Sequence, residues 1–196
     1  MTILSPRNNK IATQPTMETY IALLRGINVS GQKMIKMEEL KRMLASLNFN
    51  NVRTYIQSGN ITFNCAKSDP AELANMIAEK ILEHFRFEVP VLIRTLADMG
   101  KISNNNPFLE KRNAPIEKLL VTFFPEEPDP VHWNKIEKDS YLPDEFVVSG
   151  REVYLYCPNG YGRTKLTNSF FESKLKLTAT TRNWKTLETL LKMSVI

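Results

Sequence analysis

The sequence contains few of the side chains with which enzymes bind metal ions or attack substrates. Only two histidines and two cysteines occur among its 196 residues. His84 and His132 stand far apart in the chain, and neither has a second metal-ligating residue at the spacing of a zinc site. A serine between two glycines, the motif of a nucleophile elbow, is also missing. The sequence therefore argues against a metal-dependent or triad-dependent hydrolase, and we expect no metal and no cofactor.

Long apolar runs are missing as well. None approaches the roughly 20 residues that a membrane-spanning helix needs, and Met1 to Thr16 has no continuous apolar stretch of the kind found in signal peptides. Cys65 and Cys157 each fall inside a strand pattern, so we expect two buried thiols rather than a disulfide. We therefore predict a cytoplasmic protein with no membrane contact.

The sequence also lacks a strong excess of one charge. Its formal net charge is +5 and its pI is about 9.2, and the basic residues do not form a block. A mild basic balance is compatible with nucleic acid or phosphate as a partner but does not require one. What is present is enough apolar surface for a core, because 42% of the residues are hydrophobic and 9% are aromatic.

Residues 17–103 alternate between strand and helix patterns. Leu40 and Leu44 fall on one face of the first helix by their spacing, and Asp69 is an expected N-cap with Pro70 in the first helical position. The expected elements are a strand at 18–25, a helix at 36–47, strands at 51–57 and 60–65 joined by a tight turn at Ser58-Gly59, a helix from Pro70 that includes Leu73, Ile77, Ile81 and Phe85, and a strand at 89–95. This β-α-β-β-α-β order is that of a ferredoxin-like plait, the split βαβ arrangement.

The same order begins again in residues 116–196, after a connector at residues 104–115 in which Asn and Pro accumulate. The expected order there is β-α-β-β-α-α, a partial echo of the first half. The elements are a strand at 118–124, a helix at 130–138, a hairpin of strands at 145–149 and 152–157 around Gly150, and helices at 165–174 and 183–193. We predict an α+β fold with two ferredoxin-like (α-β plait) halves and mainly antiparallel sheets, preceded by a loosely ordered extension at residues 1–16.

Five short stretches, taken in order, match a known pattern. They are Ala22 to Val29, Tyr55 to Asn60, Asn106 to Phe108, Pro158 to Gly160 with Arg163 to Leu166, and Thr180 to Trp184. With them the chain resembles the domain-of-unknown-function 1697 family of uncharacterised bacterial proteins, from Met17 to Met193. The resemblance implies a two-part α+β fold with ferredoxin-like halves. It implies no reaction, because the family has no established activity, and it does not extend to the residues before Met17.

The loop from Gly26 to Lys33 is the first candidate for an anion site. Its glycines have the spacing of a phosphate-binding loop, but Gln32 follows Gly31 where such a loop has lysine, and no Ser or Thr follows Lys33. A nucleotide-hydrolysing loop is therefore not expected. Two interpretations remain open: a looser anion site that uses backbone N–H groups with Arg25 and Lys33, and a turn that needs glycine for its backbone conformation.

The two hairpins place tyrosines on one face of each predicted sheet. Tyr55 shares a face with Arg53 and Gln57, and Tyr154 shares one with Tyr156. RNA-recognition modules stack bases on such a face. The paired aromatic positions of their signature are absent, which favours the alternative that the two open faces pack on each other and bury the tyrosines between the halves.

A second candidate anion site lies near the end of the chain. The loop from Gly160 to Lys165 carries two cations, and Arg182 stands just before a predicted helix. The sequence predicts that Thr180 or Thr181 caps this helix, that Trp184 faces the core and that Arg182 is free. Helix N-termini beside cations bind anions readily, although helix capping alone would explain the Thr residues equally well.

These patterns favour a binding or accessory protein that recognises a phosphate-bearing small molecule or nucleic acid at its basic loops. The alternative is an enzyme for a small anionic substrate, with arginine clamps and with Tyr55 or Tyr161 as proton donor or acceptor, which needs a strongly lowered tyrosine pKa. No catalytic residue and no oligomeric state is assigned. We expect one anion-binding cleft between the halves. Its candidate residues are Arg25, Asn28, Lys33, Tyr55, Gln57, Asn60, Arg163, Lys165 and Arg182.

Overall fold

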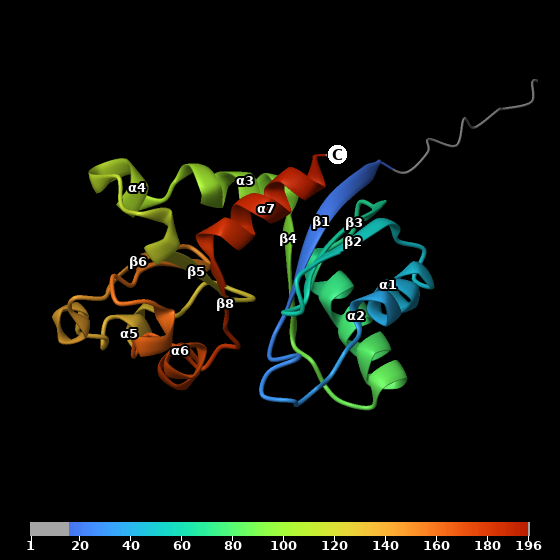
Figure 1. Ribbon diagram of the computed structural model, residues 1–196, viewed down its shortest axis with the longest axis horizontal. Helices are drawn as coiled ribbons and strands as arrows, with labels where there is room; N and C mark the ends of the chain where they lie inside the picture. The colour runs from blue at the N-terminus through green and yellow to red at the C-terminus, as the bar shows by residue number, and fades with distance from the viewer. Residues whose placement is uncertain (1–15, 196) are drawn as a thin grey trace, which may run out of the picture.

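Two four-stranded antiparallel sheets organise the computed structural model, which describes residues 16–195 apart from the side chains of residues 111 and 112 (Figure 1). Both sheets carry helices, and both have the strand order of a ferredoxin-like plait. The predicted α+β fold class with two ferredoxin-like halves is therefore confirmed. The predicted extension at residues 1–16 lies almost entirely outside the described residues.

The first half contains one sheet and three helices. Its strands are ordered β2-β3-β1-β4, and neighbouring strands run antiparallel. The elements are β1 (Met17–Leu24), α1 (Met37–Ala45), β2 (Asn50–Tyr55), β3 (Asn60–Ala66), α2 (Pro70–Phe85), β4 (Val91–Thr95) and α3 (Leu96–Asn104).

The helices α1 and α2 form where the apolar spacing predicts them. Leu40 of α1 and Ile77 of α2 are completely buried, as expected for one apolar face against the sheet. Asp69 caps α2, because its Oδ1 atom accepts a hydrogen bond of 2.7 Å from the backbone N–H of Ala71. α2 ends at Phe85, and the next residue, Arg86, caps it in a left-handed conformation with φ of +65°.

The second half repeats this architecture, with strands ordered β6-β7-β5-β8, again antiparallel. After α4 (Pro107–Arg112), its elements are β5 (Leu119–Phe123), α5 (Pro130–Trp133), β6 (Glu145–Ser149), β7 (Glu152–Tyr156), α6 (Asn168–Leu175), β8 (Thr180–Asn183) and α7 (Trp184–Ser194). Short 3-10 turns lie at Ile116–Lys118, Lys138–Tyr141 and Tyr161–Arg163.

The strand β8 corrects the predicted order of the second half. Thr180 and Thr181 lie in this strand, which pairs with β5, instead of capping the last helix. The cap of α7 is Asn183, whose side chain accepts a hydrogen bond of 2.8 Å from the backbone N–H of Thr186. The second half is therefore β-α-β-β-α-β-α, the same order as the first half when α3 is counted.

Two predicted helices of the second half are shorter than expected. The helix predicted from Lys165 begins at Asn168, because the Thr167 hydroxyl accepts a hydrogen bond of 3.2 Å from the backbone N–H of Phe170 and so caps α6 there. The helix predicted at 130–138 is the single turn α5. No helix within residues 16–195 combines the length and apolarity needed to cross a membrane.

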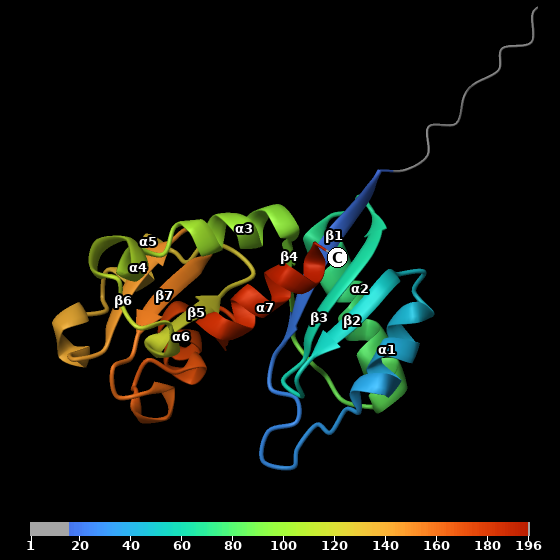
Figure 2. The ribbon, with the colours of Figure 1, turned by 45° about the horizontal axis from the view of Figure 1, so that its top comes forward.

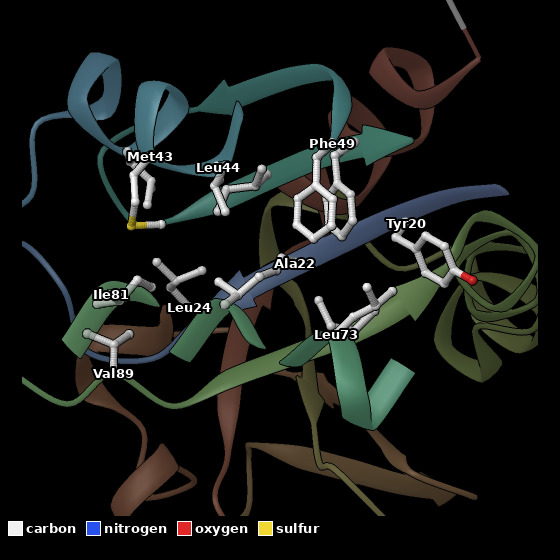
Figure 3. Packing of buried hydrophobic residues seen from close by; sticks show 14 of the residues in the cluster. Tyr20, Ala22, Leu24, Met43, Leu44, Phe49, Leu73, Ile81 and Val89 are labelled. Atoms are coloured by element: carbon white, nitrogen blue, oxygen red, sulfur yellow. The ribbon is translucent and has the colours of Figure 1, made fainter. Parts of the chain in front are cut away.

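Buried apolar side chains form three clusters. The first lies between the first sheet and the helices α1 and α2 (Figure 3). In this cluster Phe49 stacks on Phe63, with ring centroids 4.3 Å apart. The second packs α6 against the outer face of the second sheet. The third lies between the two sheets and is closed by α3 and α7. Figure 2 shows α7 crossing between the halves, and it contacts β1 and β3 of the first sheet as well as β5 and β8 of the second.

The hairpin tyrosines belong to the cluster between the sheets. Tyr154 is buried and donates a hydrogen bond of 3.1 Å to the carbonyl of Ile102 in α3. Tyr55 and Tyr156 are partly buried against the same cluster. The prediction that the two open sheet faces pack together and bury the tyrosines is therefore confirmed, and these faces offer no platform for stacked bases.

Truncation of a buried residue on α2 should destabilise the protein strongly. We expect Ile77→Ala to lower the free energy of unfolding by ~2–5 kcal/mol because it leaves a cavity under the helix, and the same range for Leu40→Ala. Leu82→Ala on the same helix is the control, since Leu82 is 43% exposed, and it should cost at most ~1 kcal/mol. Denaturant unfolding followed by circular dichroism measures all three; equal costs for Ile77→Ala and Leu82→Ala would contradict the assigned helix face.

Candidate functional site

Arg182 connects the second half of the chain to the first. Its side chain leaves β8 and reaches the end of β1 and the turn between β2 and β3. The Nη2 atom donates hydrogen bonds to the carbonyls of Leu24 at 2.7 Å and Ser58 at 3.2 Å, and Nε donates to the side-chain oxygen of Asn60. Arg182 is only 9% exposed, so the prediction of a free arginine at this position is wrong.

All N–H groups of the Arg182 guanidinium donate hydrogen bonds, but the group has no counter-ion among the described side chains. Its Nη1 atom donates to the hydroxyl of Thr180 at 2.7 Å and to the carbonyl of Thr181 at 3.0 Å, which completes the five donors of an arginine. No carboxylate among the described side chains forms an ion pair with it. Burial, and after it repulsion from Arg25, lowers the pKa of Arg182 to about 10, so the group stays charged at neutral pH.

Asn60 and Asn28 were predicted to bind a ligand. Their side-chain amides form hydrogen bonds with backbone carbonyls of the protein. The buried Asn60 donates from Nδ2 to the carbonyl of Tyr55 and to the hydroxyl of Ser58, each at 3.0 Å. Asn28 donates from Nδ2 to the carbonyl of the exposed Gln57 at 2.8 Å and so joins the first loop to the hairpin turn. Both amides therefore fix loop geometry.

The first loop, Gly26 to Lys33, forms a tight turn and does not have the backbone geometry of a phosphate-binding loop. The backbone N–H of Gln32 donates to the carbonyl of Val29 at 2.9 Å, and the central residues Ser30 and Gly31 both have positive φ, as in a type I′ turn. The helix α1 begins at Met37, several residues beyond the turn, so no helix N-terminus faces it. This geometry is that of a turn that needs a glycine, and the looser anion site with Arg25 and Lys33 beside the turn stays a prediction.

Arg25 forms an ion pair across the two halves. Its Nε and Nη2 atoms donate to the two carboxylate oxygens of Glu172 on α6, at 3.2 and 3.1 Å. Glu172 also accepts a hydrogen bond of 3.0 Å from the backbone N–H of Ala179, which leads into β8. Among the described side chains, the Nη1 group of Arg25 has no hydrogen-bond partner, and both ionised groups remain more than a quarter exposed.

A groove of about 510 Å³ opens between the first loop and α6. Lys33 lines it and donates from Nζ to the backbone carbonyl of Glu88 at 2.7 Å. The groove contains one carboxylate, that of Glu172, against the cations of Arg25 and Lys33, and the buried Arg182 is a third positive charge close enough to repel Arg25. Its lining residues are Arg25, Gly26, Val29, Ser30, Gln32, Lys33, Pro90, Glu172 and Thr178.

Arg163 and Lys165 do not join this groove. Both are exposed and line a separate hollow of about 360 Å³, together with Asp144 and Asn159. The single cleft predicted from the sequence is therefore two sites. Arg25 and Lys33 line the groove between the halves and the buried Arg182 lies close enough to Arg25 for the two charges to interact, whereas the two cations of the second loop lie elsewhere on the second half.

The geometry gives no support to the enzyme alternative. Tyr161 packs beside the second cluster, and burial raises the pKa of its phenol despite hydrogen bonds with Thr181 and the backbone of Asn168. A proton-transfer tyrosine would need the opposite shift. Within residues 16–195 there is no group of three or more His, Cys, Asp or Glu side chains placed to hold a metal ion.

The sequence analysis overlooked a second buried arginine, Arg94 of β4. It is 1% exposed, and its Nε donates to Glu152 of β7 at 2.8 Å while Nη2 donates to the carbonyl of Phe124 at 2.5 Å. The signal was a charged residue inside an otherwise apolar strand, Val91–Thr95. A charge in a buried strand needs a partner, and here the partner comes from the other half.

Comparisons with known proteins identify a fold and a family but no activity. A family model described as "Protein of unknown function (DUF1697)" matches residues 17–154. The solved structure of the conserved bacterial protein SP0830 from Streptococcus pneumoniae matches with a TM-score of 0.70 and 24% sequence identity, over 91% of this chain and 99% of that one. No curated protein matches.

Gly59 should be the least replaceable glycine near the groove. With φ of +74°, an added Cβ would lie 2.6 Å from Cβ of Leu24 and 2.8 Å from Cδ1 of Ile27. We expect Gly59→Ala to cost at least ~2 kcal/mol of unfolding free energy, because backbone would have to shift. Gly150→Ala, in the matching turn of the second hairpin, is the control: it meets no atom within 4 Å, and thermal denaturation should show a smaller loss.

Proposed function

The chain belongs to the DUF1697 family of proteins of unknown function, and from the geometry of its own groove we propose that it binds a phosphate-bearing ligand between its two halves. The observation that carries this proposal is the charge of Arg182, which is buried without a carboxylate partner among the described side chains and close enough to Arg25 for the two charges to repel each other. The ligand would contact Arg25 and Lys33 at the surface, whereas Arg182 would act through its charge alone.

Electrostatics favour an anion in this groove. A guanidinium buried among neutral acceptors keeps a larger electric field than a solvated one, because the surrounding protein screens it less than water does. Arg25 and Lys33 add to that field, and Glu172 cancels only part of it. A phosphate group carries up to two negative charges and would offset the excess. Ser30 and Gln32, both exposed on the turn, are able to donate hydrogen bonds to its oxygens.

The open shape of the groove suits a binding role. It lies at the surface between a turn and a helix, so a phosphate attached to a larger molecule has room to enter. Small phosphate compounds and nucleic acid share this chemistry, and we propose the small compound because the sheet faces that would stack bases are covered by each other. A cytoplasmic location stays a prediction.

Replacement of Lys33 should weaken anion binding. We expect Lys33→Gln to bind inorganic phosphate, pyrophosphate and nucleotides about tenfold more weakly than the unaltered protein at low ionic strength, since one of the two surface cations is lost. Lys36→Gln is the matched control: Lys36 is exposed three residues along the chain but lines a different hollow, with Met34 and Met37. Isothermal titration measures each affinity. Arg25 is a less suitable target because its loss leaves Glu172 unpaired.

The proposal would be wrong if none of these anions binds at low salt, or if Lys33→Gln and Lys36→Gln bind equally well. Binding through charge should also weaken as salt is added. A short single-stranded oligonucleotide serves as a further ligand. Affinity that rises with its length, and a steep salt dependence, would identify nucleic acid instead of a small phosphate compound.

A further inference from the structure

The registers of the two sheets place the halves in residue-by-residue correspondence. In the first sheet Arg94 of β4 pairs with Ile21 of β1. In the second sheet Arg182 of β8 pairs with Val121 of β5 in the same way. The two buried arginines therefore occupy equivalent positions of equivalent strands.

The contacts of the two arginines are equivalent as well. Arg182 donates to the carbonyl of Leu24, three residues beyond Ile21, and Arg94 donates to the carbonyl of Phe124, three residues beyond Val121. Each arginine thus crosses to the other half and binds the end of its first strand. The contact between the halves is therefore reciprocal: each half contributes one buried arginine that binds the other half.

The acceptors of the two Nε atoms correspond too, but they differ in charge. Asn60 of β3 pairs with Leu23, and Glu152 of β7 pairs with Phe123. Leu23 and Phe123 each lie two residues after the residue that pairs with an arginine, so Asn60 and Glu152 occupy equivalent positions. Arg94 therefore has a carboxylate at the position where Arg182 has a neutral amide. The contact of Arg94 is an ion pair, whereas the charge of Arg182 has no carboxylate beside it within the described part of the chain.

A second difference also makes the surroundings of Arg182 more positive than those of Arg94. Arg25 stands four residues after Ile21, and its counterpart four residues after Val121 is Pro125, which lines the corresponding groove beside Arg94. The other cation of that groove, Arg151, lies 3.6 Å from the carboxylate of Asp98. Both arginines of that groove therefore have carboxylate partners, whereas at the other end Arg25 has one in Glu172 and Arg182 has none among the described side chains.

We propose that Asn60 is the residue that determines the charge specificity of the groove. By giving Arg182 an uncharged acceptor where the counterpart arginine has a carboxylate, Asn60 leaves the positive charge of Arg182 to be balanced by a bound anion. This inference rests on the proposed function and adds to it a reason why the ligand must be negatively charged: the charge of the ligand offsets that of Arg182, as the carboxylate of Glu152 offsets that of Arg94 at the other end.

The test is to supply that carboxylate from the protein. Asn60→Asp should bind pyrophosphate at least about tenfold more weakly than the unaltered protein, because a fixed negative charge next to Arg182 cancels the field that attracts the ligand. Asn75→Asp is the matched control: it makes the same chemical change and the same change in net charge, in the groove at the other end. It should keep the affinity within about twofold.

A second variant is needed because Asn60→Asp also removes the two hydrogen bonds that the amide donates, to the Tyr55 carbonyl and to the Ser58 hydroxyl, and this loss could disturb the fold. Ser58→Asp places a carboxylate in the half-buried turn where the Asn60 amide already donates, and it should weaken binding in the same way. Circular dichroism checks the fold of each variant. If the unaltered protein binds pyrophosphate, and the folded Asn60→Asp and Ser58→Asp variants bind it as tightly as Asn75→Asp, the role of Asn60 is refuted while the proposed function stands. If the unaltered protein binds no anion, both fail.

Discussion

Two buried arginines, one from each half, are the interaction on which this architecture depends. Each guanidinium reaches the end of the first strand of the other half and donates to its terminal carbonyl, Leu24 for one and Phe124 for the other. A buried guanidinium is costly unless all of its donors are satisfied. The strand ends and hairpin turns that supply the acceptors must therefore hold their positions, and the packing of the sheets against each other fixes those positions.

Periodicity in the sequence predicted the parts of the fold that depend on local pattern. The buried faces of α1 and α2 followed from the spacing of residues such as Leu40 and Ile77, and the opposite faces of Val153 and Tyr154 followed from alternation along a strand. The strand β8 could not be found in this way. Thr180–Asn183 is short and polar, and its residues favour helix caps; only pairing with the buried β5 makes it a strand. The proposed boundary at residues 104–115 stays a prediction.

The candidate site was predictable in composition but not in arrangement. Arg25 and Lys33 line one groove, and the charge of Arg182 acts on that of Arg25, so part of the predicted set of cations does lie close together. The sequence could not show that Arg182 is buried, because its partners Asn60 and Leu24 are 122 and 158 residues away along the chain. Nor could it separate the cations of the two loops, since that separation depends on how the halves face each other.

The position of α7 has a consequence for the order in which the protein is made. This helix closes the cluster between the sheets by contacting β1 and β3 as well as β5 and β8. A ribosome synthesises α7 after every strand that it covers. The first sheet therefore emerges with one of its faces exposed and keeps it so until the second half and α7 have followed. During that interval Ile21 and Leu23 lack the part of the cluster that the second half and α7 supply, and apolar surface left uncovered in this way favours aggregation of an incompletely folded chain.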